Sequence, residues 1–240
     1  MKLWSYGDSH AAGHELGTKH AHDLAKSWLL KEFGYEDRNQ ARDELGLEKY
    51  NVKIKKKWYK HINNQYIPEL SYAGLLANKL GYKLVNQAIP GSSNSLSMLK
   101  MYQDIDKWDK DDIILFSIVT PLRFIPAHDI TELNHQVHWL SDKDAEVMLR
   151  VGPHDVCFKL QTHGYIKLAK SLHKNVFTLK TVGEDTSVEG RDCDINLPIS
   201  FTDYLDENGF NTYLNRYPGG HFHETCHELF ADYIYNESFS

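Results

Sequence analysis

The chain has 240 residues, 41% of them hydrophobic and 25% charged, which suits one soluble globular domain that needs no disulfide or metal to bury a core. Its net charge of -6 argues against a nucleic-acid-binding protein, because phosphate binding needs clustered Lys and Arg. No apolar run approaches about 18 residues and the first residues lack a signal-peptide core, so we expect a cytoplasmic protein without a membrane partner.

The cysteines and the basic residues predict no special chemistry. Cys157, Cys193 and Cys226 are odd in number and widely spaced, which excludes a recognisable disulfide framework. The basic run at 53–60 contains two aromatic residues and could contact phosphates or sugars. Because isolated charge runs are usually solvated, we interpret it as an exposed face of a helix or loop.

Strands and helices are predicted to alternate along the chain, each bounded by glycine, proline or polar residues. The strands are expected at 3–6, 83–89, 112–120 and 176–182. Helices are expected at 19–33, 68–81, 96–108 and near 160–172. A final helix has one apolar face made by Cys226, Leu229, Phe230, Tyr233 and Ile234.

The run from 113 to 119 is almost continuously apolar and rich in β-branched residues, which is typical of a parallel strand covered on both faces. Together with the alternation of elements, it predicts an α/β fold, a three-layer α/β/α sandwich with a parallel, flavodoxin-like central sheet. We expect a single domain over 1–240, with insertions near 35–66 and 125–155.

Polar segments follow three of the predicted strands, at 7–10, 90–94 and 120–123, and a glycine-rich turn at 219–223 precedes the last helix. In open parallel sheets, ligands bind at the carboxyl ends of the strands, where these segments would meet. The sequence therefore predicts a site at this edge.

The residue types at this edge suit acyl transfer, which needs a nucleophile, a base and N–H donors for the oxyanion. Ser9 follows the first strand at a tight turn into a helix, so its backbone N–H is available as one donor. Gly91 would present its N–H without a side chain in the way, and Asn94 could add an amide. A histidine of the last turn could act as general base.

The order of these segments resembles the SGNH (GDSL-type) hydrolase family, which has a Gly-Asp-Ser block near the N-terminus and a histidine block near the C-terminus. The first block is similar to 3–10, the second to Asn86 through Asn94, and the last to 221–231. The opening residues also resemble those of phage-encoded members of the family.

This resemblance implies a serine esterase or acetylesterase that forms an acyl-Ser9 intermediate on a small or carbohydrate-linked carboxylic ester, with no cofactor and no metal. His221 would be the base, with His223 as the alternative, and the N–H groups of Ser9 and Gly91 would form the oxyanion hole. The residues expected around the substrate are Asp8, His10, Thr120, Arg123 and His223.

The chain departs from the family pattern at two places. The Gly-x-Asn-Asp block after the central strand is replaced by 119–123, so Asn94 is expected to substitute for the missing oxyanion amide. Pro218 and Gly219 stand where the family has the acid before its histidine. A backbone carbonyl, Asp185 or Asp203 could orient the base instead.

Two other interpretations compete with the enzyme. The spacings of His10 and His14, of His20 and His22, and of the histidines from 221 to 227 could serve a zinc site, although no HExxH or CxxC pattern is present. Alternatively, the chain is a catalytically inactive binding or structural module with the same fold, associated with a phage virion.

Overall fold

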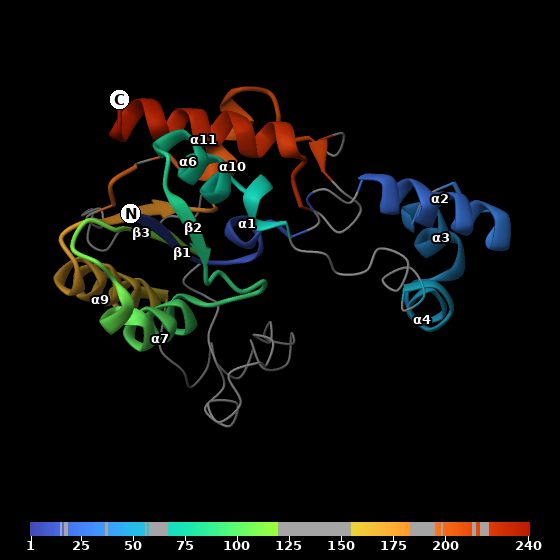
Figure 1. The fold of residues 1–240 in the computed structure, drawn as a ribbon. Coiled ribbons are helices and arrows are strands. Elements are labelled where there is room, and N and C mark those ends of the chain that lie inside the picture. Colours follow the sequence, from blue (N-terminus) through green and yellow to red (C-terminus); the bar gives the residue numbers. More distant parts are fainter. Residues whose placement is uncertain are drawn as a thin grey trace.

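The computed structural model describes residues 1–14, 16, 19–36, 38–55, 57, 67–119, 155–182, 195–197, 199–212, 215–216 and 221–240. Within these residues, four parallel strands form one sheet in the order β2-β1-β3-β4. The strands are β1 (Lys2–Tyr6), β2 (Lys83–Asn86), β3 (Ile113–Ile118) and β4 (Val176–Lys180). Figure 1 shows this sheet between helices on both of its faces.

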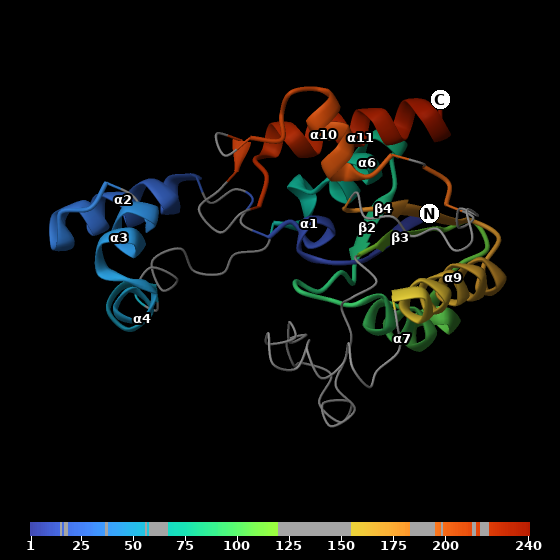
Figure 2. The same ribbon diagram turned by 180° about the vertical axis from the view of Figure 1, so that it is seen from behind.

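Helices and helical turns follow each of the four strands. They are α1 (Ser9–Ala12), α2 (Lys19–Phe33), α3 (Arg38–Leu45), α4 (Leu47–Tyr50), η1 (Asn51–Lys55), η2 (Pro68–Leu70), α6 (Tyr72–Leu80), α7 (Asn94–Asp104), η3 (Ile105–Lys107), α9 (Asp155–Leu172), α10 (Phe201–Glu207) and α11 (Glu224–Ser238). Helices α6, α10 and α11 lie over one face of the sheet, and α7 and α9 lie over the other (Figures 1 and 2).

Two cores follow from the alternation of side chains along the strands, since neighbouring residues point to opposite faces. Leu3 and Leu115 belong to the core with α6, α10 and α11, whereas Trp4 and Ile114 belong to the core with α7 and α9. Every residue of β3 is buried, because helices cover both faces of this central strand.

The observed architecture confirms the predicted three-layer α/β/α sandwich with a parallel central sheet. The strand order is that of a flavodoxin-like sheet over its first four strands. Strands β2, β3 and β4 are shorter than expected, while α9 begins five residues before the predicted position 160. None of the described helices has the length and apolarity that a bilayer span requires.

Helices α2, α3 and α4 project from the sandwich as a separate lobe (Figure 1). Leu29, Ala41, Tyr50 and Ile54 form a small core of their own inside it. The described part of the insertion expected near 35–66 is therefore largely helical. The insertion expected near 125–155 lies outside the described residues, except for Asp155.

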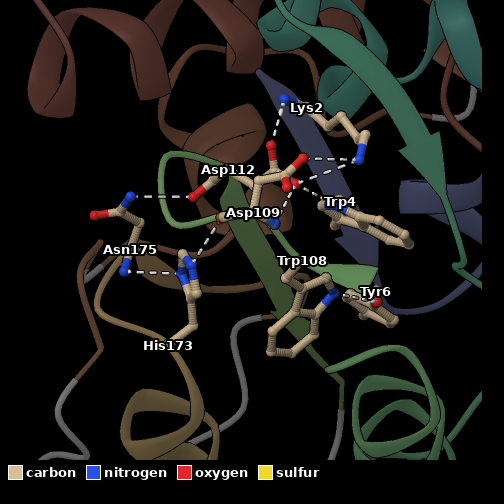
Figure 3. Close-up of polar contacts among 8 residues, drawn as sticks. All are labelled: Lys2, Trp4, Tyr6, Trp108, Asp109, Asp112, His173 and Asn175. Carbon is tan, nitrogen blue, oxygen red and sulfur yellow. Dashed lines mark hydrogen bonds and ion pairs between the residues drawn. The ribbon is translucent and has the colours of Figure 1, made fainter. Parts of the chain in front are cut away.

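At the amino ends of β1 and β3, a polar cluster holds the two strands together (Figure 3). The buried Asp112 carboxylate accepts hydrogen bonds from the Lys2 N–H at 2.8 Å, the Trp4 indole at 2.9 Å and the Asp109 N–H at 3.1 Å. Burial alone would raise the pKa of Asp112, but these hydrogen bonds and the Lys2 ammonium lower it below its usual value. These contacts at the amino ends of the strands are structural. The predicted site lies at the carboxyl ends of the strands.

Candidate functional site

The turn after β1 brings Gly7, Asp8 and Ser9 to the carboxyl edge of the sheet. A Cβ on Gly7 would lie 2.6 Å from the Cβ of Ser117, so this position has room only for glycine. Asp8 is the N-cap of α1, and its Oδ1 accepts a hydrogen bond from the His10 N–H at 3.1 Å. Ser9 is 8% exposed. Because it is the first residue of α1, its N–H has no acceptor within the helix.

Helix α1 ends after one turn because Gly13 adopts the left-handed conformation, with φ of 75°. A Cβ on Gly13 would lie 2.5 Å from the carbonyl oxygen of Ile67, and the Ile67 N–H bonds the Gly13 carbonyl. The N–H of His14 then donates to the Ser9 carbonyl at 3.0 Å. His14 therefore lies outside the helix, so the four-residue spacing of His10 and His14 does not place them on one helical turn.

The loop after β2 lies beside this turn. The Ile89 N–H donates to the Gly7 carbonyl at 3.0 Å, and the Asn86 amide donates to the Ala11 carbonyl at 2.9 Å. Gly91 follows with φ of 74°, and a Cβ there would have no neighbour within 4 Å. The loop thus needs glycine at 91 for its backbone conformation rather than for space.

Asn94 begins α7 and is fastened to the end of β3. Its Nδ2 donates to the Val119 carbonyl, its Oδ1 accepts from the Val119 N–H, both at 2.9 Å, and Nδ2 also lies 3.4 Å from Thr162 Oγ1. The side chain is 3% exposed. Its hydrogen-bonding groups are engaged in joining two elements, so the geometry gives Asn94 a structural position rather than that of the expected oxyanion donor.

Three histidines gather around α1. The His221 ring lies 5.4 Å from that of His10 and 4.4 Å from that of His14, measured between ring centroids. Phe201 and Phe222 also contact His10, at 5.4 and 5.8 Å. The turn before the last helix therefore brings His221 against the segment that carries Ser9.

A fourth histidine, His227, lies buried behind this group on α11. Its Nδ1 accepts the Tyr72 N–H at 3.1 Å, and its ring stacks on the Tyr72 ring. Burial, reinforced by the charges of His10 and His221, lowers the pKa of His227 well below its usual value. His227 is therefore neutral, with its proton on Nε2 because Nδ1 is an acceptor.

The remaining expected residues are only partly described. His223 is the N-cap residue of α11, with its N–H on the Asn215 carbonyl at 2.9 Å and its carbonyl accepting from the Cys226 N–H at 3.0 Å. Asp203 lies in the first turn of α10, where its N–H bonds Ser200 Oγ. Three expected residues, Thr120, Arg123 and Asp185, lie outside the described residues, as does the turn at 217–220.

Among the described residues, no three His, Cys, Asp or Glu side chains are arranged to hold a metal ion, so the geometry there does not support the zinc interpretation. The side chains of His20 and His22 fall outside the description. Sequence reasoning also missed α10, whose Phe201 packs on His10 and His227. The signal for this helix was present, since Ser200 caps it and an acidic residue follows three positions later.

Comparison with known proteins adds no assignment, because neither a protein-family model nor a curated protein matches the chain. The resemblance to SGNH hydrolases depends on the short motifs alone.

Proposed function

We propose that the protein is a serine esterase of the SGNH type that hydrolyses a small or carbohydrate-linked carboxylic ester through an acyl-Ser9 intermediate. The observation that carries the proposal is the contact of His221 with His10 of α1 and with His14, since His221 lies 212 positions after Ser9 in the sequence. The loop of Gly91 joins the same group through the hydrogen bond between Ile89 and Gly7. The proposed nucleophile, base and glycine N–H thus come from three segments that are distant in the sequence.

In the proposed reaction, His221 takes the proton of the Ser9 hydroxyl as Oγ attacks the ester carbonyl. The N–H groups of Ser9 and Gly91 would stabilise the oxyanion, and His221 would then protonate the leaving alcohol. A water molecule, deprotonated by His221, would release the acid and restore Ser9. His227 does not compete as base, because its lowered pKa makes it a poor proton acceptor.

A fluorophosphonate probe tests the proposal, because it forms a stable bond only with an activated serine. We expect the purified wild-type protein to be labelled and Ser9→Ala to be unlabelled. Ser5→Ala is the matched control, because Ser5 is a buried serine of the preceding strand whose hydroxyl has no hydrogen-bond partner among the described residues. This control should be labelled like the wild type.

The same experiment separates the enzyme from the binding module. A wild-type protein that stays unlabelled, or a Ser9→Ala variant that is labelled equally, would exclude the acyl-Ser9 mechanism. In that case the inactive SGNH-like module would be the better description of the protein.

A further inference from the structure

We propose that the ring of His14 positions the base His221, a role that a carboxylate of the last turn has in the family the chain resembles. This inference rests on the proposed function, in which His221 is the base. The starting observation is the contact between the two rings, whose centroids are 4.4 Å apart and whose planes are inclined by 56°.

The distance between the rings indicates packing rather than an in-line hydrogen bond. An N–H···N bond of about 2.9 Å between two imidazoles in line would put their centroids about 5 Å apart. The observed 4.4 Å is shorter, so the rings lie partly across one another. His14 therefore restricts the rotation of His221 by occupying the space beside it.

The backbone of His14 is tied to the nucleophile. Its N–H donates to the Ser9 carbonyl at 3.0 Å, and the preceding Gly13 is held against Ile67 by contact and by a hydrogen bond. Since one short segment carries both Ser9 and His14, a ring held against His14 is also held relative to Ser9. A residue on a separate loop would not give this fixed relation.

Other titratable groups also face this position. His10 contacts His221 from α1, His227 lies behind His10 at 6.4 Å, and Asp8 caps the same helix. These groups stay in place when His14 is replaced, so a change in activity can be assigned to the His14 ring.

The test compares His14→Ala with His14→Phe, which keeps a ring but cannot titrate. With p-nitrophenyl acetate, we expect His14→Ala to lower kcat about 10- to 100-fold, with KM changed less than about twofold, because a misplaced base slows proton transfer without weakening substrate binding. His14→Phe should recover most of the lost kcat.

His173→Phe is the matched control, because His173 lies in the polar cluster at the opposite edge of the sheet (Figure 3). Its kcat per folded molecule should equal that of the wild type. Wild-type kcat in His14→Ala, or an equal loss in His14→Ala and His14→Phe, would overturn the inference.

NMR of the His221 ring supplies a second readout that needs no turnover. We expect the nuclear Overhauser contacts between the rings of His221 and His10 to weaken in His14→Ala and to persist in His14→Phe, and unchanged contacts in His14→Ala would also overturn the inference. An unlabelled wild type in the fluorophosphonate experiment would instead refute the proposed esterase, and the NMR result would still decide whether His14 positions His221.

Discussion

At Gly7 a single hydrogen atom stands where any other residue would carry a Cβ. That Cβ would approach the Cβ of Ser117 to 2.6 Å and that of Ala11 to 3.2 Å. Ser117 belongs to the buried strand β3 and Ala11 to α1, so neither neighbour can move without displacing its element. The turn that presents Ser9 therefore depends on the absence of a side chain at Gly7.

Gly7→Ala should lower the free energy of unfolding by about 1–3 kcal/mol, the usual cost of overpacking a core. Chemical denaturation would measure the loss as a lower midpoint. Gly164→Ala is the control, because a Cβ in this part of α9 meets no atom within 4 Å and replaces a flexible residue in a helix. If Gly7→Ala were as stable as Gly164→Ala, the close contact with Ser117 would not exist in solution.

At the scale of elements, α6 and α11 meet through His227. The imidazole accepts the first N–H of α6, which no residue within that helix can accept, and stacks on Tyr72. The lowered pKa of His227 means that the unfolded chain binds a proton more readily than the folded one. The contribution of His227 to stability should therefore be fully present well above pH 6.5 and decrease as the pH falls below this value.

His227→Asn tests this prediction, because asparagine offers an acceptor in place of Nδ1 and does not titrate. We expect the variant to be less stable than the wild type at pH 8, since it fills less of the core. Its further loss between pH 8 and pH 5, measured by urea denaturation, should be smaller than that of the wild type. Equal losses would show that His227 does not contribute to acid sensitivity.

The elements differ in how far their sequences predicted them. The apolar run of β3 and the apolar stripe of α11 were predicted correctly because their patterns reflect burial directly. The helices α3 and α4 were not predicted, because their residues bury only the small core of the lobe and so carry a weak pattern. The short α10 was also missed, although its capping sequence was present.

The candidate site was predictable only where a motif marks it. Ser9, Gly91 and His221 were identified from the order of short blocks, and they stay predictions as functional residues. The contact of His14 with His221 was not foreseen, because it joins residues far apart in the sequence through the turn at Gly13. The position of Asn94 depends on where β3 ends, since Val119 supplies both of its backbone partners.

At the scale of the whole molecule, the lobe and the sandwich have separate cores. Leu29, Ala41, Tyr50 and Ile54 pack with one another, whereas the strands pack with the helices of the two faces. A small core of this kind buries little apolar surface, so its stability should be low compared with that of the sandwich. The lobe should therefore open independently.

Leu29→Ala should destabilise the lobe by about 2–4 kcal/mol through the cavity that it leaves. Hydrogen exchange should show faster exchange across α2, α3 and α4, with unchanged protection in β1 and β3. Leu30→Ala is the matched control, because Leu30 is 53% exposed and its truncation leaves no cavity. Faster exchange of the strands in Leu29→Ala would show that the two cores unfold together.

The contact between α1 and the last turn also has a consequence for the synthesis of the chain. Translation adds His221 212 residues after Ser9. A growing or prematurely terminated polypeptide would thus carry the proposed nucleophile without its base. On the proposed function, esterase activity would begin only when the strands and the final helix have assembled. Translation fragments that retain Ser9 would then be inactive.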